Sequence, residues 1–94
     1  MEYKIGDFIQ IKSKKEIDNT EIRIGWTYQM SLFCETIWEI ERVDLYDGSS
    51  GIYTIYHFKN EPEEMKRWLW TSEMFRPYYD FSEPEEKEVM NLLF

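Results

Sequence analysis

The sequence lacks the cysteines that form stabilising disulfide bonds in small secreted domains. Its single cysteine, Cys34, excludes an intrachain disulfide, and such cysteine usage fits a reducing cytosol. No apolar run approaches the roughly 18 residues that a membrane-spanning helix needs. The first residues, MEYKIGDF, lack the hydrophobic stretch of a signal peptide. We therefore expect a soluble, cytoplasmic protein that does not associate with membranes.

Basic residues are also few. The chain has 11 Lys and Arg against 19 Asp and Glu, for a net charge of −8. Residues 1–30 are balanced, so the whole acidic excess falls in residues 31–94. Because neutralisation of phosphates by Lys and Arg dominates nucleic-acid affinity, direct nucleic-acid binding is disfavoured. A basic protein partner is favoured, including one that itself handles nucleic acid. Acidity that serves solubility alone is the alternative.

Residues for nucleophilic or metal chemistry are equally scarce. The chain has one histidine, His57, and one cysteine, Cys34, and no spacing that resembles a zinc site. A hydrolase or transferase needs an activated nucleophile or a metal cluster. We expect Cys34 to be a small buried hydrophobe and His57 to lie on a strand face. The sequence therefore predicts a protein that is not an enzyme and uses no cofactor or metal.

Aromatic residues are abundant, at 18% of the chain, and they fall in short β-favouring runs. A phase change between Trp38-Ile40 and Val43-Leu45 predicts a β-bulge near Glu41-Arg42. The stretch DGSSG at 47–51 predicts a tight turn. The third run is apolar on both faces, which predicts a central strand. The expected strands are residues 3–12, 36–46, 52–58, 65–70 and 76–79.

Helical signals are short. Ser13 with Glu16 has the pattern of a capping box, and Trp26, Met30 and Phe33 fall on one helical face. The stretch TSEMF, residues 71–75, predicts one turn of 3₁₀ helix. Residues 82–94 predict a terminal helix with an apolar face late in its length.

These elements predict a mainly β (α+β) fold, a small SH3-like barrel of about five strands. The barrel would occupy residues 1–80, with a helical insertion at about 13–35 after the first strand. An acidic C-terminal helix, residues 81–94, would pack on the barrel or extend from it. The expected core includes Trp70, Met74 and Phe75.

Three segments carry a resemblance. WLWTSEMFRP (68–77) resembles a signature W-x-W-[ST]-x-E-M-[FL]-x-P that recurs in small proteins of bacteriophages and prophages. IGDFIQIKS (5–13) and YQMSLFCE (28–35) resemble the opening and the helix of the same proteins. The resemblance implies an SH3-like scaffold of phage type, used for contacts rather than for chemistry, in a bacterial host cell.

Two kinds of residue are candidates for partner binding. Acidic side chains accompany the second expected strand and are predicted to form a negative edge, although edge strands also carry charge simply to prevent aggregation. Large aromatics near the end of the barrel are the second kind, since SH3-type barrels hold peptides on surface aromatics. The candidates are Glu35, Glu39, Glu41, Asp44, Asp47, Trp68 and Tyr78.

The leading hypothesis is a non-enzymatic inhibitor whose acidic surface imitates nucleic-acid phosphates. Its target would be a host defence protein such as a CRISPR or restriction nuclease, as for anti-CRISPR proteins. One alternative is a virion assembly or structural interaction protein, including a homodimer. Another is a nucleic-acid-associated barrel that uses the basic residues Lys12, Lys14 and Lys15.

Overall fold

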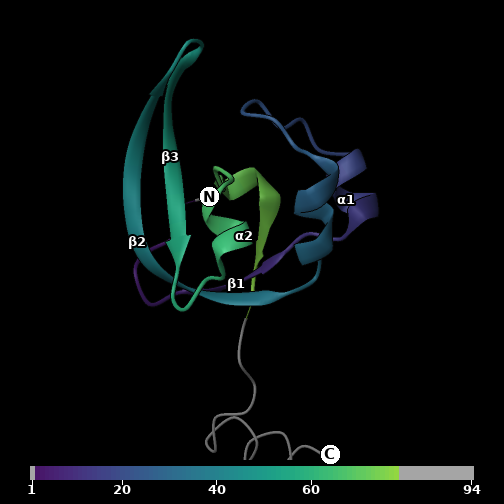
Figure 1. Ribbon diagram of the computed structural model, residues 1–94, viewed down its shortest axis with the longest axis vertical. Coiled ribbons are helices and arrows are strands. Elements are labelled where there is room, and N and C mark those ends of the chain that lie inside the picture. The colour runs from purple at the N-terminus through teal and green to yellow at the C-terminus, as the bar shows by residue number, and fades with distance from the viewer. Residues whose placement is uncertain (1, 79–94) are drawn as a thin grey trace, which may run out of the picture.

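The computed structural model describes residues 2–78 and shows a mainly β protein (Figure 1). Four strands form one antiparallel sheet in the order β3-β2-β1-β4. Their bounds are Phe8–Ile11 (β1), Ile37–Gly48 (β2), Gly51–Phe58 (β3) and Phe75–Pro77 (β4). The helices are α1 (Lys14–Asp18), η1 (Tyr28–Phe33), α2 (Glu63–Lys66) and η2 (Ser72–Met74). Among the described residues, no helix has the length and apolar character to cross a membrane. The predicted terminal helix lies outside the described residues.

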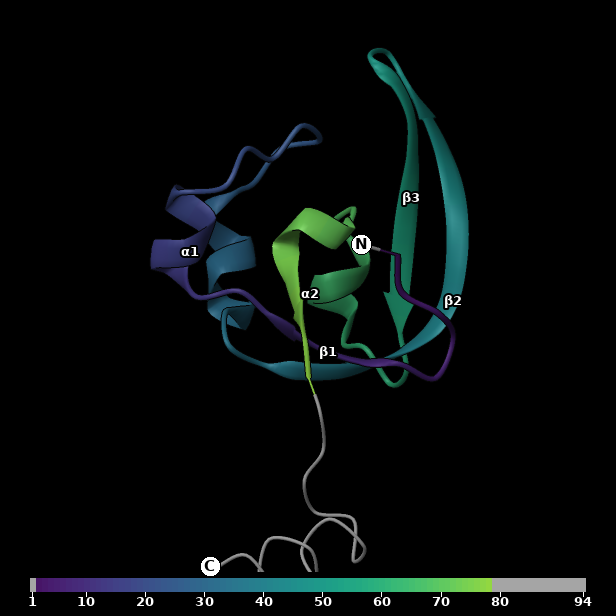
Figure 2. The same ribbon diagram turned by 180° about the vertical axis from the view of Figure 1, so that it is seen from behind.

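Strand β2 is long and pairs with two neighbours, β1 and β3. Its first residues pair with β1, with Trp38 opposite Ile9, and the remainder pairs with β3. The register shifts between Ile40 and Arg42, which confirms the bulge predicted near Glu41-Arg42. A bulge bends its strand and increases the local twist. The curved path of β2 is visible from both sides (Figures 1 and 2).

Strands β2 and β3 form a hairpin that projects from the rest of the molecule (Figure 2). Gly48 pairs with Gly51 around the two turn residues, as the DGSSG signal predicts. The prediction that the third strand is central is wrong, because β3 ends the strand order. Its apolar character has another cause: Tyr56 and Phe58 enter the core, and the Tyr56 N–H donates to the Trp70 carbonyl at 2.9 Å.

The strand predicted at residues 65–70 is also wrong, and a turn of helix, α2, stands there. Pro62 is its N-cap, with Glu63 and Glu64 in the first turn, where carboxylates favour a helix start. The Met65 carbonyl accepts from the Trp68 N–H at 3.2 Å and from the indole Nε1–H of Trp70 at 2.9 Å. The Met65 carbonyl and the Trp68 N–H are thus bonded within a turn. The alternation of Trp68 and Trp70 does not reflect a strand.

The other local signals are found close to where the sequence places them. α1 has Ser13 as its N-cap and forms the complete capping box with Glu16. The expected helix at 26–33 is the 3₁₀ helix η1, with Met30 buried. The predicted 3₁₀ turn at TSEMF is η2, and the last strand spans Phe75–Pro77. The first strand begins at Phe8 rather than at residue 3.

The capping box of α1 makes stability depend on pH. The Ser13 N–H donates to the Glu16 carboxylate, and this bond, with help from the Ser13 hydroxyl and Arg76, holds the pKa of Glu16 below its ordinary 4.5. A group whose folded-state pKa is depressed stabilises the fold above its unfolded pKa, and the effect is lost as the pH falls through the folded pKa. We therefore expect Glu16→Gln to destabilise the protein at neutral pH, by an amount that shrinks below pH 4.5.

Urea unfolding of both proteins, from about pH 7 to about pH 3, measures this difference. Glu63→Gln is a suitable control, because Glu63 is also a first-turn carboxylate, but it is exposed and its ion pair with Lys66, at 3.2 Å, lies on the surface. A difference for Glu16→Gln that stays constant across the pH range would show that the charge of Glu16 has no part in the cap.

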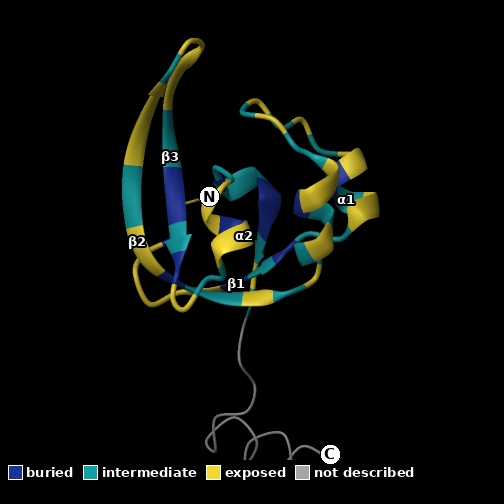
Figure 3. Ribbon diagram, in the orientation of Figure 1, coloured by how far each residue is buried: buried dark blue, intermediate teal, exposed yellow. Residues whose placement is uncertain are grey.

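One aromatic-rich core lies between the curved sheet and the segments that follow α1 and β3 (Figure 3). The predicted core residues Trp70, Met74 and Phe75 are confirmed, at 1%, 0% and 3% exposure. The Trp70 ring lies with its centroid 6.0–6.2 Å from those of Trp26, Phe33 and Phe58, in edge-to-face contacts. The other fully buried members include Ile9, Ile11, Ile40, Tyr56 and Met65.

Candidate functional site

The predicted acidic residues follow β2 from its start to its tip. Glu35 precedes the strand, is exposed and has a positive φ of 66°. Its backbone is fixed, since its N–H donates to the Ile11 carbonyl at 2.8 Å. Glu39 is half-buried and Glu41 exposed, one on each side of Ile40, where the register shift begins, and Asp47 is exposed beside the hairpin turn.

Asp44 differs from the other four. Its carboxylate lies 2.8 Å from Arg42 Nε and 2.9 Å from His57 Nε2. His57 is directly opposite Arg42 across the hairpin, and its other ring nitrogen lies 3.9 Å from Glu61. Arg42 therefore balances Asp44, and the acidic edge is interrupted in its middle. Within residues 2–78, Glu35, Glu39, Glu41 and Asp47 form no ion pair. We call Glu39 and Glu41 the bulge carboxylates.

The predicted aromatic candidates, Trp68 and Tyr78, lie outside β2. Trp68 is half-buried against the core and lines an apolar cavity of about 160 Å³ with Leu32 and Phe33. Tyr78 is half-buried at the end of β4, where its N–H donates to the Phe8 carbonyl at 3.1 Å. It lines a different cavity, and neither cavity contains any of the five acidic candidates. Because Phe8 also lies opposite Glu39, Tyr78 stands across β1 from Glu39, whereas Trp68 lies in a different place.

Exposed apolar residues near Trp68 were missed by the sequence reasoning. Tyr28 and Leu32 of η1 are 77% and 71% exposed. Both belong to the 3₁₀ helix η1, whose Met30 is buried in the core.

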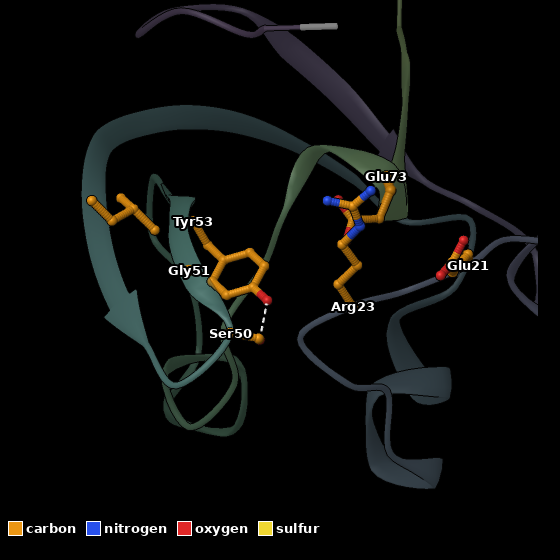
Figure 4. Close-up of a pocket in the computed structure, with 7 residues that line it drawn as sticks. Glu21, Arg23, Ser50, Gly51, Tyr53 and Glu73 are labelled. Carbon is orange, nitrogen blue, oxygen red and sulfur yellow. Dashed lines mark hydrogen bonds between the residues drawn. The ribbon is translucent and has the colours of Figure 1, made fainter.

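A second feature missed from the sequence is a groove beside the hairpin (Figure 4). It has a volume of about 380 Å³ and separates β3 from the segment between α1 and η1. The Tyr53 ring points into this space, and its hydroxyl is hydrogen-bonded to Ser50 Oγ. Glu21, Arg23 and Glu73 lie across from it. We call this space the hairpin groove.

The side chains that could act as nucleophiles or metal ligands were examined for reactivity-favouring surroundings, beginning with Cys34. Cys34 is half-buried rather than fully buried as expected, and burial, followed by the nearby charge of Glu35, raises the pKa of its thiol above 9.0. The thiol is therefore mostly protonated at neutral pH and a weak nucleophile. Among the described side chains, no group of three or more His, Cys, Asp or Glu is arranged to hold a metal ion.

The chain was compared with protein families, curated proteins and solved structures. No protein-family model matches the chain, and no curated protein or solved structure shows significant similarity to it.

Proposed function

We propose that the chain is a non-enzymatic protein-binding module built on a small SH3-like barrel. Three features support the barrel. The bulge lets β2 take part in both halves of a bent sheet, and the 3₁₀ helix η2 leads directly into the last strand. The third is the bond from Tyr56 to the Trp70 carbonyl, which links edge strand β3 to the segment that leads to β4.

The partner, in this proposal, is a basic protein that handles nucleic acid, such as a CRISPR or restriction nuclease of a bacterial host. The observation that carries the proposal is the pair of bulge carboxylates, which form no ion pair with a described residue, while Asp44 nearby is balanced by Arg42. Residues 2–78 hold fourteen acidic and ten basic side chains, so the described part of the chain has a negative net charge. Together with the phage-type motifs, this favours an inhibitor that occupies a phosphate-binding groove.

Reversal of the bulge carboxylates tests this proposal. We expect Glu39→Lys with Glu41→Lys to weaken partner binding by roughly 10- to 100-fold, because two attractions become repulsions. The partner is recovered from bacterial lysate with the tagged full chain, purified, and titrated against each variant by calorimetry at low and high salt. The matched control is Glu63→Lys with Glu64→Lys on α2, which changes the net charge equally.

The control should bind within about twofold of the unaltered chain. Equal losses in both double variants would mean that only the overall charge matters. Unchanged binding in the Glu39/Glu41 variant would remove the bulge carboxylates from the interface. A purified partner with no affinity for nucleic acid would contradict the inhibitor proposal.

Virion assembly is the second candidate, and exposed apolar side chains favour it. Leu45 and Ile52 on the hairpin are 75% and 70% exposed, in addition to Tyr28 and Leu32 on η1. Exposed apolar surface of this kind marks contact sites. This candidate requires a defined oligomer in analytical ultracentrifugation. The nucleic-acid alternative has only a small patch, with Lys14 and Lys15 exposed on α1.

A further inference from the structure

The free edge of β3 is a second binding surface, separate from the bulge carboxylates. We propose that it takes up an extended segment of a partner protein as an additional strand, with a Lys or Arg of that segment in the hairpin groove. β3 ends the strand order, and the hairpin projects beyond the body of the molecule in both views (Figures 1 and 2). This inference deepens the proposed protein-binding function but uses different residues.

The hydrogen-bond register shows which groups the edge offers. The Tyr56 N–H points away from β2, because it donates to the Trp70 carbonyl. In an antiparallel pair, the residues whose backbone groups face the partner strand alternate with residues whose groups face outward. Ile52 and Thr54 have the same parity as Tyr56, and they pair with β2 without a break in register. Their N–H and C=O groups therefore face outward, and no described backbone group bonds to them.

These four groups match one side of an incoming strand. Addition of a strand to a sheet edge gains main-chain hydrogen bonds from groups that are otherwise only solvated. Trp70 occupies the edge at Tyr56 and so limits the free stretch to the outer half of β3. The added segment therefore runs between the hairpin tip and Thr54.

The hairpin groove lies beside this stretch and supplies the specificity. Ile52, Tyr53 and Gly51 form its β3 side. Across from them are the carboxylates of Glu21 and Glu73 and a single cation, Arg23 (Figure 4). None of these three side chains forms an ion pair with a described residue. The local excess of negative charge favours a basic side chain on the incoming strand.

Charge also selects the occupant. A second copy of the chain would bring another net charge of −8 to the same edge. It would also place the groove's own carboxylates opposite each other if the two hairpins met edge to edge. A basic segment of another protein has neither penalty, and it can cover Ile52, which is 70% exposed.

The test is selection of a library of random twelve-residue peptides against the full chain, with synthesis of the enriched peptides. We expect enrichment of Lys or Arg flanked by β-favouring residues, and protection of the Ile52 and Thr54 amides in residue-resolved hydrogen exchange when peptide is added. Ile52→Pro removes one outward N–H without breaking a bond to β2, and proline is tolerated at such edges. It should weaken peptide binding at least about tenfold, whereas Ile52→Thr, which keeps the N–H, should stay within about threefold.

Glu21→Lys with Glu73→Lys should reduce affinity for the basic peptides by a similar factor, and Arg23→Ala should raise it. The circular dichroism of each variant should match that of the unaltered chain. Enrichment without basic residues, protection at other amides, or no enrichment at all would overturn the proposal. If protection of the Ile52 and Thr54 amides grew with protein concentration in the absence of peptide, the occupant of the β3 edge would be a second copy of the chain. Peptide binding is measured at β3 and the hairpin groove, and partner binding is measured with Glu39→Lys and Glu41→Lys, so failure of the proposed function would be recognised separately.

Discussion

Replacing Trp70 with alanine is expected to lower the free energy of unfolding by about 3–5 kcal/mol. The side chain is 1% exposed, and its ring contacts those of Trp26, Phe33 and Phe58. Truncation leaves a large cavity and removes the Nε1–H donor of the Met65 carbonyl. Since small domains have only roughly 5–15 kcal/mol of stability, this loss would remove a substantial part of it.

Urea unfolding followed by far-ultraviolet circular dichroism measures this loss. Trp70→Phe keeps a ring and should cost less than alanine. Trp68→Ala is the control within the same motif, because Trp68 is only half-buried and rests on the outside of the core. If Trp68→Ala lowered the free energy of unfolding more than Trp70→Ala, Trp68 rather than Trp70 would contribute more to the core.

Thr71→Val is expected to have the opposite effect, with a gain of about 1 kcal/mol in the free energy of unfolding. Thr71 is 3% exposed, and its Oγ1 is buried with no hydrogen-bond partner among the described residues. A buried hydroxyl without a partner carries a desolvation cost of about 1–3 kcal/mol. Thr71 precedes η2, but its side chain makes no capping bond that valine would lose.

Thermal unfolding provides the measurement, since 1 kcal/mol corresponds to about 4–8 °C in a domain of this size. Thr71→Ser is the matched control: it keeps the hydroxyl and loses the methyl group, so it should lower the midpoint. A lower midpoint for Thr71→Val would show that the hydroxyl has a partner in solution.

The sequence predicted the features that depend on neighbouring residues. The capping box at Ser13, the hairpin turn and the bulge at Glu41-Arg42 all arise from patterns within a few residues, and all are confirmed. The strand predicted at 65–70 failed because two signals competed there. Alternating tryptophans indicate a strand, but Pro62 followed by two glutamates begins a helix, and the bond from Trp70 to the Met65 carbonyl supports the helical turn.

The sites were harder to predict because they depend on distant pairings. The contact of Asp44 with His57 depends on the position of His57 across the hairpin, which the register fixes. The hairpin groove joins Glu21 to Tyr53, more than thirty residues away in the sequence. The position of β3 at the edge depends on β1 lying between β2 and β4. Periodicity within one segment contains none of this information.

The position of the core tryptophan along the chain has a consequence for synthesis. β1 pairs with β4, so that Ile9 lies opposite Pro77, and Trp70, Met74 and Phe75 fill the centre of the core. A chain emerging from the ribosome can close the β2–β3 hairpin early, since its turn is local. It cannot bury Ile9 and Ile11 until the segment that follows Trp70 has left the exit tunnel. Until then the edge of β1 that pairs with β4 in the finished protein stays free.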